Sequence, residues 1–307
     1  METTALGKTG LEVTRLGIGL SELGYNIPEG DEQPATDVLN AALDQGINLL
    51  DTAACYALSE ERIGAVSHRR DEFFLATKCG HYLPRGEGED WTAEVIEHSV
   101  ERSLTRMKTD HLDVLQLHSC TAEVLERGEV IEALQKARDA GKTRFIGYSG
   151  DNDSAECAVN LGVFDTLQTS FNLVDQKALG TLFPKAGEQG MGIIVKRPIA
   201  NAVWGAAEDP KPYERYPTYT EEYFRRGGEM SAEGPLPSEP DDRILTALGF
   251  VLAHDVVDVA IVGTQRPQYV ESNVEMVNDR LPIASEAVEA LHERYDRHSE
   301  GAWDQCG

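Results

Sequence analysis

The segment Ile47-Asn-Leu-Leu-Asp-Thr52 is a short, β-prone run with an apolar centre and a polar end. Runs of this kind recur along the chain, and amphipathic stretches with helical spacing lie between them. Nearly continuous apolar runs of this length are typical of parallel strands that are covered on both faces. The predicted strands are Leu16–Leu20, Ile47–Thr52, Phe73–Lys78, Val114–His118, Arg144–Ser149, Thr166–Ser170, Gly192–Lys196 and Val259–Gly263.

The stretches between these strands carry the start and stop signals of helices, such as the N-cap Thr92 and the C-terminal glycine Gly141. The predicted helices are Gln33–Gln45, Thr92–Lys108, Glu123–Ala140, Asp151–Leu161, Asp175–Glu188 and Pro267–Val277. Eight strands that alternate with helices predict an α/β fold, the (β/α)8 TIM barrel. The alternative is a doubly wound sheet, but its third glycine is missing after Leu16-Gly-Ile-Gly-Leu20.

Two polar segments interrupt the repeat, Pro84–Trp91 and the longer Ala206–Asp241. We therefore predict one barrel domain over residues 1–307, with a long loop insertion at about 201–241. Loops of this length inside a compact domain are usually functional or disordered. Five aromatic residues suggest that the insertion forms a wall over a pocket, while packing on the outer helices is the alternative; they are Tyr213, Tyr216, Tyr219, Tyr223 and Phe224.

Acidic residues number 53 against 28 basic ones, so the formal net charge is −25. A surface this negative repels nucleic acid and anionic membranes, and we predict neither as a partner. The acidity suits a salt-rich cytoplasm or simply an acidic enzyme. The N-terminus has no signal-peptide pattern, and the five cysteines form no C-x-x-C pair. We therefore predict a cytoplasmic protein in a reducing compartment, and the oligomeric state is left open.

Polar residues stand at or just beyond the ends of three consecutive predicted strands. Asp51 and Tyr56 follow the second strand, Lys78 closes the third and His118 closes the fourth. In a barrel these four side chains converge on the carboxyl-terminal face, where active sites of this architecture lie. An ammonium near a phenol lowers the pKa of the phenol, and a carboxylate holds the ammonium in place. With a histidine to orient an oxygen, the four predict proton donation to a carbonyl group.

The same segments resemble those of the aldo-keto reductase superfamily over nearly the whole chain. The matching motifs are Leu11-Glu-Val-Thr-Arg-Leu-Gly-Ile-Gly19, Asn48-Leu-Leu-Asp-Thr-Ala-Ala-Cys-Tyr56, Ser59-Glu-Glu-Arg-Ile-Gly64, His111-Leu-Asp-Val-Leu-Gln-Leu-His118, Lys142-Thr-Arg-Phe-Ile-Gly-Tyr-Ser149 and Ile261-Val-Gly-Thr264. The resemblance implies a (β/α)8 reductase that uses NADPH. It implies that Tyr56 is the general acid, that Lys78 and Asp51 tune it, and that His118 orients the carbonyl.

The resemblance also implies cofactor-binding positions. Ser149 and Gln168 match residues that bind the nicotinamide carboxamide, although Gly150 replaces the usual asparagine. Lys196 stands where many members have an aromatic ring, and with Arg197 it is expected either to approach the pyrophosphate or to form a salt-bridged strand end.

The last strand leads through Gly263 and Thr264 into a helix, whose N-terminus favours phosphate. Arg266 is expected to contact a 2′-phosphate, which favours NADP over NAD. Asn273 matches the adenine contact of the family, and Ser272 replaces its usual acidic neighbour.

The predicted substrate is a small carbonyl compound, or the matching alcohol or sugar in the reverse direction. Tyr25, Trp91 and Trp204 are the expected substrate contacts because of their places in the loops. Cys55, Cys79 and Cys120 flank the catalytic positions, but adjacent strand residues point to opposite sides, so no metal site is predicted.

Two other functions remain as alternatives. One is a cofactor-binding regulatory module with little turnover. The other is a barrel hydrolase or lyase that uses Asp51 and His118 with a metal ion.

Overall fold

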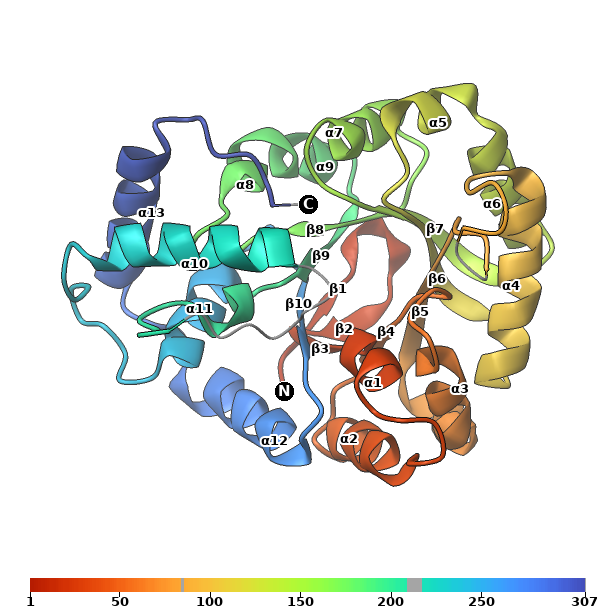
Figure 1. Ribbon diagram of the computed structural model, residues 1–307, viewed down its shortest axis with the longest axis horizontal. Coiled ribbons are helices and arrows are strands. Elements are labelled where there is room, and N and C mark those ends of the chain that lie inside the picture. The colour runs from red at the N-terminus through yellow and green to blue at the C-terminus, as the bar shows by residue number, and fades with distance from the viewer. Residues whose placement is uncertain (84–85, 209–216, 307) are drawn as a thin grey trace.

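The computed structural model describes residues 1–83, 86–208 and 217–306. Eight parallel strands close into a barrel in the order β10-β3-β4-β5-β6-β7-β8-β9, and helices surround it (Figure 1). The predicted (β/α)8 barrel is confirmed. The strands are β3 (Leu16–Gly19), β4 (Leu49–Asp51), β5 (Phe74–Cys79), β6 (Leu112–His118), β7 (Thr143–Ser149), β8 (Thr166–Ser170), β9 (Gly192–Lys196) and β10 (Val259–Gly263).

Helices form the outer layer around the strands. They are α1 (Ser21–Tyr25), α2 (Gln33–Asp44), α3 (Ser59–Ile63), α4 (Ala93–Met107), α5 (Ala122–Arg127), α6 (Glu129–Asp139), α7 (Asn152–Leu161), α8 (Lys177–Thr181), α9 (Phe183–Glu188), α10 (Pro217–Ser231), α11 (Arg243–Leu252), α12 (Pro267–Glu275) and α13 (Ser285–Ser299). Of these helices, α4, α6, α7, α9 and α11 contact the strands directly. None of the helices that the structure describes is both long and apolar enough to cross a membrane.

A hairpin that the sequence analysis did not predict covers the amino-terminal end of the barrel. Strands β1 (Thr3–Ala5) and β2 (Glu12–Thr14) pair antiparallel. Leu6 and Val13 of this hairpin region pack with inward-facing residues of the barrel, among them Leu49. Because this apolar cluster fills the amino-terminal part of the barrel interior, the polar side chains that can perform chemistry lie at the opposite, carboxyl-terminal end.

The pairing register of the strands brings their last residues to the same level at the carboxyl-terminal end of the barrel. Asp51 pairs with Gly19 across β4 and β3, and His118 pairs with Ser149 across β6 and β7. Ser149 in turn pairs with Gln168 of β8. Because the strands are parallel, the residues that close them project into one circle of loops.

Several predicted boundaries differ from the structure. The predicted helix Glu123–Ala140 is interrupted at Gly128, whose φ of 80° ends α5 and begins α6. The predicted helix Asp175–Glu188 is divided into α8 and α9. The insertion at about 201–241 is not a continuous loop, because α10 lies within it. The segment was predicted as a loop because it interrupts the strand–helix repeat, whereas α10 packs against α13.

Candidate active site

A large cavity opens at the carboxyl-terminal end of the barrel, with a volume of about 940 Å³. This volume lies at the upper end of the range for ligand pockets, about 300–1,000 Å³. The predicted site residues that line it are Tyr25, Asp51, Tyr56, His118, Ser149, Gln168, Lys196, Arg197, Gly263, Thr264 and Arg266.

Lys78 lies beneath this cavity and is tied to Asp51. Its Nζ donates to Asp51 Oδ2 at 2.6 Å and to the carbonyl of Thr52 at 2.8 Å. Both charged side chains are almost fully buried, at 1% and 3% exposure. The same Nζ lies 5.2 Å from the centre of the Tyr56 ring. A desolvated, compensated ammonium therefore stands next to the phenol, as the sequence analysis expected.

The second oxygen of Asp51 connects this pair to the neighbouring strands. Its Oδ1 accepts from Gln168 Nε2 at 2.8 Å, and Gln168 Oε1 accepts from Ser149 Oγ at 3.1 Å. A continuous polar chain thus runs from the predicted carboxamide-binding residues to Lys78. It fixes the orientation of the Gln168 amide and of the Asp51 carboxylate.

His118 and two tyrosines complete this side of the cavity. The His118 and Tyr56 rings meet edge to face with centres 5.5 Å apart. Tyr25 lies 5.8 Å from Tyr56, and its hydroxyl donates to the carbonyl of Cys55 at 2.6 Å. The structure therefore brings Asp51, Tyr56, Lys78 and His118 into one place.

A second, partly buried ion pair lies across the cavity, at the ends of β7 and β9. Lys196 Nζ is 2.8 Å from Asp151 Oδ2, and Arg197 Nη1 is 3.9 Å from the same oxygen. Burial opposes the charge of Asp151, but the two cations prevail and hold its pKa at about 2. Of the two alternatives for Lys196, the structure has the salt-bridged strand end, while both cations still line the cavity.

The far end of the cavity has the features of an anion-binding region. Arg266 is exposed at the N-terminus of α12, and its Nη1 donates to the hydroxyl of Tyr269 at 3.3 Å. Ala200, Asn201 and Ala202 all have left-handed φ angles of 46–60°, which is rare for residues other than glycine. Asn201 lines the cavity, and its buried Nδ2 has no hydrogen-bond partner within the described part of the chain. It is thus a donor suited to a ligand.

Three predicted contacts do not line the cavity among the residues that the structure describes. Trp204 is buried, and its Nε1 donates to Glu239 Oε1 at 2.9 Å. Trp91 stacks on His81 with ring centres 4.6 Å apart. Asn273 borders a small crevice beside Thr264. The two tryptophans were chosen from loop placement alone, which does not give the direction of a side chain.

The expected aromatic wall is partly present. Tyr219 lines the cavity, whereas Tyr223 is buried and donates to Asp175 Oδ2 at 3.0 Å. Phe224 packs against the apolar core. Tyr213 and Tyr216 lie outside the described residues.

The sequence analysis missed other residues of the cavity wall, including Glu22, His81 and Tyr269. His81 could have been found, because it stands two residues beyond β5 and so follows the same strand-end rule as His118. Tyr269 is the third residue of α12, and no motif marked it.

The three cysteines near the site differ in their surroundings. Burial raises the pKa of Cys79, and it raises that of Cys120 to about 12, so neither thiol ionises near neutral pH. Cys55 lines the cavity, and its Sγ lies 3.3 Å from His118 Nδ1. Of these three thiols, Cys55 is the one that lines the cavity.

Comparisons with known proteins agree with this architecture. Residues 15–295 match the model of the aldo/keto reductase family. The chain is 32% identical to an L-galactose dehydrogenase of Arabidopsis thaliana, covering 91% of this chain and 89% of that protein. It is 28% identical to a D-threo-aldose 1-dehydrogenase of a Pseudomonas species, covering 91% and 93%. The holo form of an aldo-keto reductase from Bacillus halodurans superposes with a TM-score of 0.80 at 28% identity, covering 96% of both chains.

Proposed function

Because the chain belongs to the aldo/keto reductase family of nicotinamide-dependent oxidoreductases, we propose that it interconverts carbonyl compounds and alcohols with NADP(H) and Tyr56 as the general acid. The observation that carries the proposal is the Asp51–Lys78 ion pair, which lies beneath the Tyr56 ring in the cavity that His118 also lines. Four residue types with complementary roles in carbonyl reduction meet there.

The role of each side chain follows from charge. Tyr56 donates its phenolic proton to the carbonyl oxygen as negative charge develops on that oxygen. Lys78 stabilises the phenolate that remains, and Asp51 keeps the buried ammonium charged and in place. His118, at the edge of the Tyr56 ring, donates a hydrogen bond that orients the carbonyl oxygen. In the reverse direction the same phenolate takes the proton from an alcohol.

The remaining cavity fits a dinucleotide cofactor. A bound reduced nicotinamide would supply the hydride. Ser149 and Gln168 form the polar floor at the nicotinamide end, and Asn201 offers an unused amide donor along the cavity. Gly263, Thr264 and the N-terminus of α12 would hold the phosphates. Lys196, Arg197 and Arg266 attract the polyanion locally, which a protein of net charge −25 requires. Asn273 would reach the adenine from its crevice.

Sugars are the substrate class that the relatives favour. Two relatives are named as dehydrogenases of galactose and of aldoses. Tyr25 and Tyr219 border the cavity and would contact the sugar, whereas the buried Trp204 would support the wall. We propose a cytoplasmic enzyme with neither nucleic acid nor a membrane as its partner, since its acidic surface repels both.

The decisive experiment follows NADPH absorbance with a panel of aldehydes and aldoses, in wild type and in Tyr56→Phe. Loss of the proton donor should lower kcat on the order of 10³-fold, because general acid catalysis contributes about 10²–10⁴-fold. Cofactor affinity, measured by quenching of protein fluorescence, should stay within about threefold, since Tyr56 is assigned to the carbonyl and not to the cofactor.

Tyr82→Phe is the matched control, because Tyr82 is an exposed tyrosine in the loop after β5 that does not line the cavity. It should keep wild-type kcat. Turnover in Tyr56→Phe equal to that of this control would eliminate Tyr56 as the acid.

A further inference from the structure

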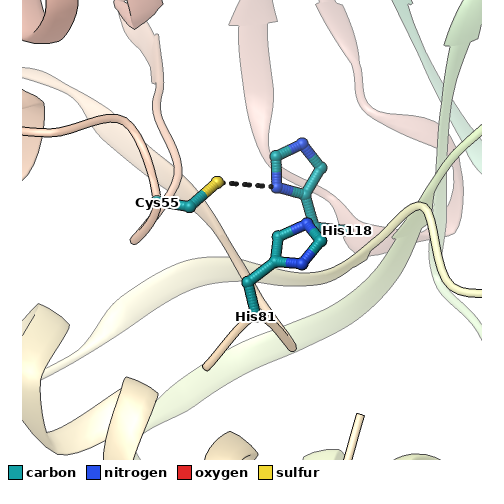
Figure 2. Close-up of side chains that lie close together, drawn as sticks. All are labelled: Cys55, His81 and His118. Atoms are coloured by element: carbon teal, nitrogen blue, oxygen red, sulfur yellow. Dashed lines mark hydrogen bonds between the residues drawn. The ribbon is translucent and has the colours of Figure 1, made fainter. Parts of the chain in front are cut away.

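Three side chains with metal-binding atoms meet at the wall of the cavity. Cys55, His81 and His118 follow the neighbouring strands β4, β5 and β6, and their ligand atoms all lie within 4.8 Å of one another. Figure 2 shows the sulfur of Cys55 directed at the His118 ring, with the His81 ring beside it. Sulfur and imidazole nitrogen are the ligands that zinc prefers.

The spacing of the atoms fits one ion. A tetrahedral zinc ion holds sulfur at about 2.3 Å and nitrogen at about 2.0 Å, so two such ligands lie about 3.5 Å apart. Cys55 Sγ and His118 Nδ1 are already 3.3 Å apart. With the same geometry, His81 needs to move by only about 1 Å to bring its nitrogen to this distance from the other two ligand atoms.

His81 is oriented as metal-binding histidines usually are. Its Nδ1 lies 2.8 Å from Asp90 Oδ2, and the other oxygen of Asp90 accepts from the backbone N–H of Tyr82 at 2.7 Å. A carboxylate that accepts from Nδ1 places the ring proton there and the lone pair on Nε2. Such carboxylate–histidine pairs fix the tautomer of metal ligands and raise their basicity.

Contacts between Gly80 and Trp91 support this arrangement. The Trp91 ring packs against His81, and the backbone N–H of Trp91 donates to the carbonyl oxygen of Gly80 at 2.8 Å. A side chain at Gly80 would lie 1.8 Å from the Trp91 ring, so the glycine is required for this close packing. The loop therefore returns on itself and positions His81 at the cavity wall.

We infer that Cys55, His81 and His118 form a binding site for Zn²⁺ or a similar divalent cation, and that the bound ion inhibits the enzyme. On binding, the Cys55 thiol releases one proton to solvent, and the resulting thiolate joins the metal without any change of oxidation state. Three protein ligands leave the fourth position open toward the cavity. The ion withdraws His118 from the carbonyl oxygen and stands where substrate must enter. This site differs from the absence of metal that the sequence predicted, because that prediction compared Cys55 with other cysteines and not with His81.

Calorimetric titration of the chelator-treated protein with zinc sulfate tests the site without reference to turnover. One ion per chain should bind. Repeating the titration in buffers of different ionisation enthalpy should show the release of about one proton per bound ion. Cobalt(II) should give a thiolate-to-metal absorption band in the near ultraviolet that Cys55→Ser lacks. No zinc binding, or a cobalt spectrum that survives Cys55→Ser, would overturn the proposal.

Variants then assign the ligands. Cys55→Ser and His81→Ala should weaken zinc binding more than Asp90→Asn, whose effect should be about 10–100-fold, as for outer partners of metal ligands. His111→Ala is the matched control, because His111 pairs with Asp110 at 2.7 Å but precedes β6 at the other end of the strand. Cys157→Ser is the control thiol, and neither control should change the affinity.

Activity supplies the last readout. Zinc should inhibit the wild-type reductase at concentrations near its calorimetric Kd. Asp90→Asn, at a residue that does not line the cavity, should turn over carbonyls and require about 10–100-fold more zinc for the same inhibition. Zinc that activates wild type, or that inhibits Asp90→Asn at the same concentration, contradicts the inhibitory role. If the protein reduces no carbonyl compound, the calorimetric and cobalt results still decide whether the site exists.

Discussion

Two aspartate–lysine pairs, one fully and one partly buried, stand at the same end of the barrel and differ in what surrounds them. Lys78 of the Asp51 pair lies 5.2 Å from the Tyr56 ring. The Asp151 pair is enclosed by Arg197 and by the C-terminal segment Asp304–Cys306, where Gln305 donates to Ser170 O at 2.7 Å. The charges are alike, so such an ion pair does not by itself indicate catalysis. Under the proposed function, the Tyr56 ring that faces Lys78 separates a chemical role from a scaffolding one.

Replacing each lysine with methionine should separate these roles. Lys78→Met should lower kcat on the order of 10³-fold, because the phenolate of Tyr56 loses its cation. Lys196→Met should chiefly raise the Kd for NADPH and lower kcat far less, since Lys196 lines the cavity but is held by Asp151. Steady-state kinetics and cofactor titration of both variants measure the split.

Stability must be controlled in this comparison. The Lys78→Met variant leaves the Asp51 carboxylate buried without its partner. This costs about 3–5 kcal/mol of the free energy of unfolding, so lost activity has to be separated from lost folding. The double variant Asp51→Asn with Lys78→Met removes both charges and should recover the free energy of unfolding but not turnover. Equal kcat losses in Lys78→Met and Lys196→Met would remove the proposed distinction.

The strand-end positions of the Asp51 pair and of Lys196 could be predicted from the sequence, because parallel strands direct their carboxyl ends to one face, whereas Asp151 was not predicted as the partner of Lys196. Asp51, Lys78 and His118 each close a strand or lie next to its end, and the barrel brings them together without further information. The same rule places His81, two residues beyond β5, near this face, but the direction of its ring depends on the Trp91 contact. That packing is set by tertiary structure, which periodicity does not report.

The region around the insertion was harder to predict for a related reason. Helix α10 contains Gly227 and Gly228, which lower helix propensity, and it is stabilised instead by packing of Tyr223 in the core. The C-terminal segment was not predicted either. Its hydrogen bonds join Gln305 to Asn152 and Thr169, which lie more than 130 residues away in the chain.

A third carboxylate makes stability on the Asp151 side fall as pH rises toward neutrality. Burial, with repulsion from Asp151, raises the pKa of Asp175 to about 7. A folded-state pKa above the unfolded value of 3.8 favours folding most at low pH, and this stabilisation is lost as pH rises through about 7. Asp151 behaves oppositely, since its pKa of about 2 gives stability above pH 3.8 that is lost toward pH 2.

Relative to wild type, Asp175→Asn should therefore raise the free energy of unfolding, and this gain should grow by a few kcal/mol between pH 5 and pH 9. Urea unfolding at fixed ionic strength measures the difference at each pH. Asp37→Asn, on an exposed position of α2, is the control and should show no such trend. If the difference in unfolding free energy between wild type and Asp175→Asn stays constant with pH, then Asp175 remains ionised, or remains neutral, over the whole range.

The smallest expected effect concerns Arg266 at the outer end of the cavity, beyond both ion pairs. Its guanidinium is exposed and lies 5.5 Å from the centre of the Tyr269 ring. Solvent weakens an exposed charge contact, so Arg266→Ala should raise the Kd for NADPH about 10-fold and that for NADH less than twofold. Fluorescence titrations with both cofactors measure the two constants.

Any lost cation weakens the attraction of a polyanion to a protein of net charge −25, so a general effect must be separated from a local one. Arg127→Ala removes an exposed arginine from α5 and leaves the cavity intact. It should shift the affinity for NADPH only slightly, and raised salt should abolish that shift because it screens distant charges. Equal losses for NADPH and NADH in Arg266→Ala, or equal losses in the two arginine variants, would mean that Arg266 does not recognise the 2′-phosphate. The proposed preference for NADP would then have to come from Lys196 and Arg197, on the side of the second ion pair.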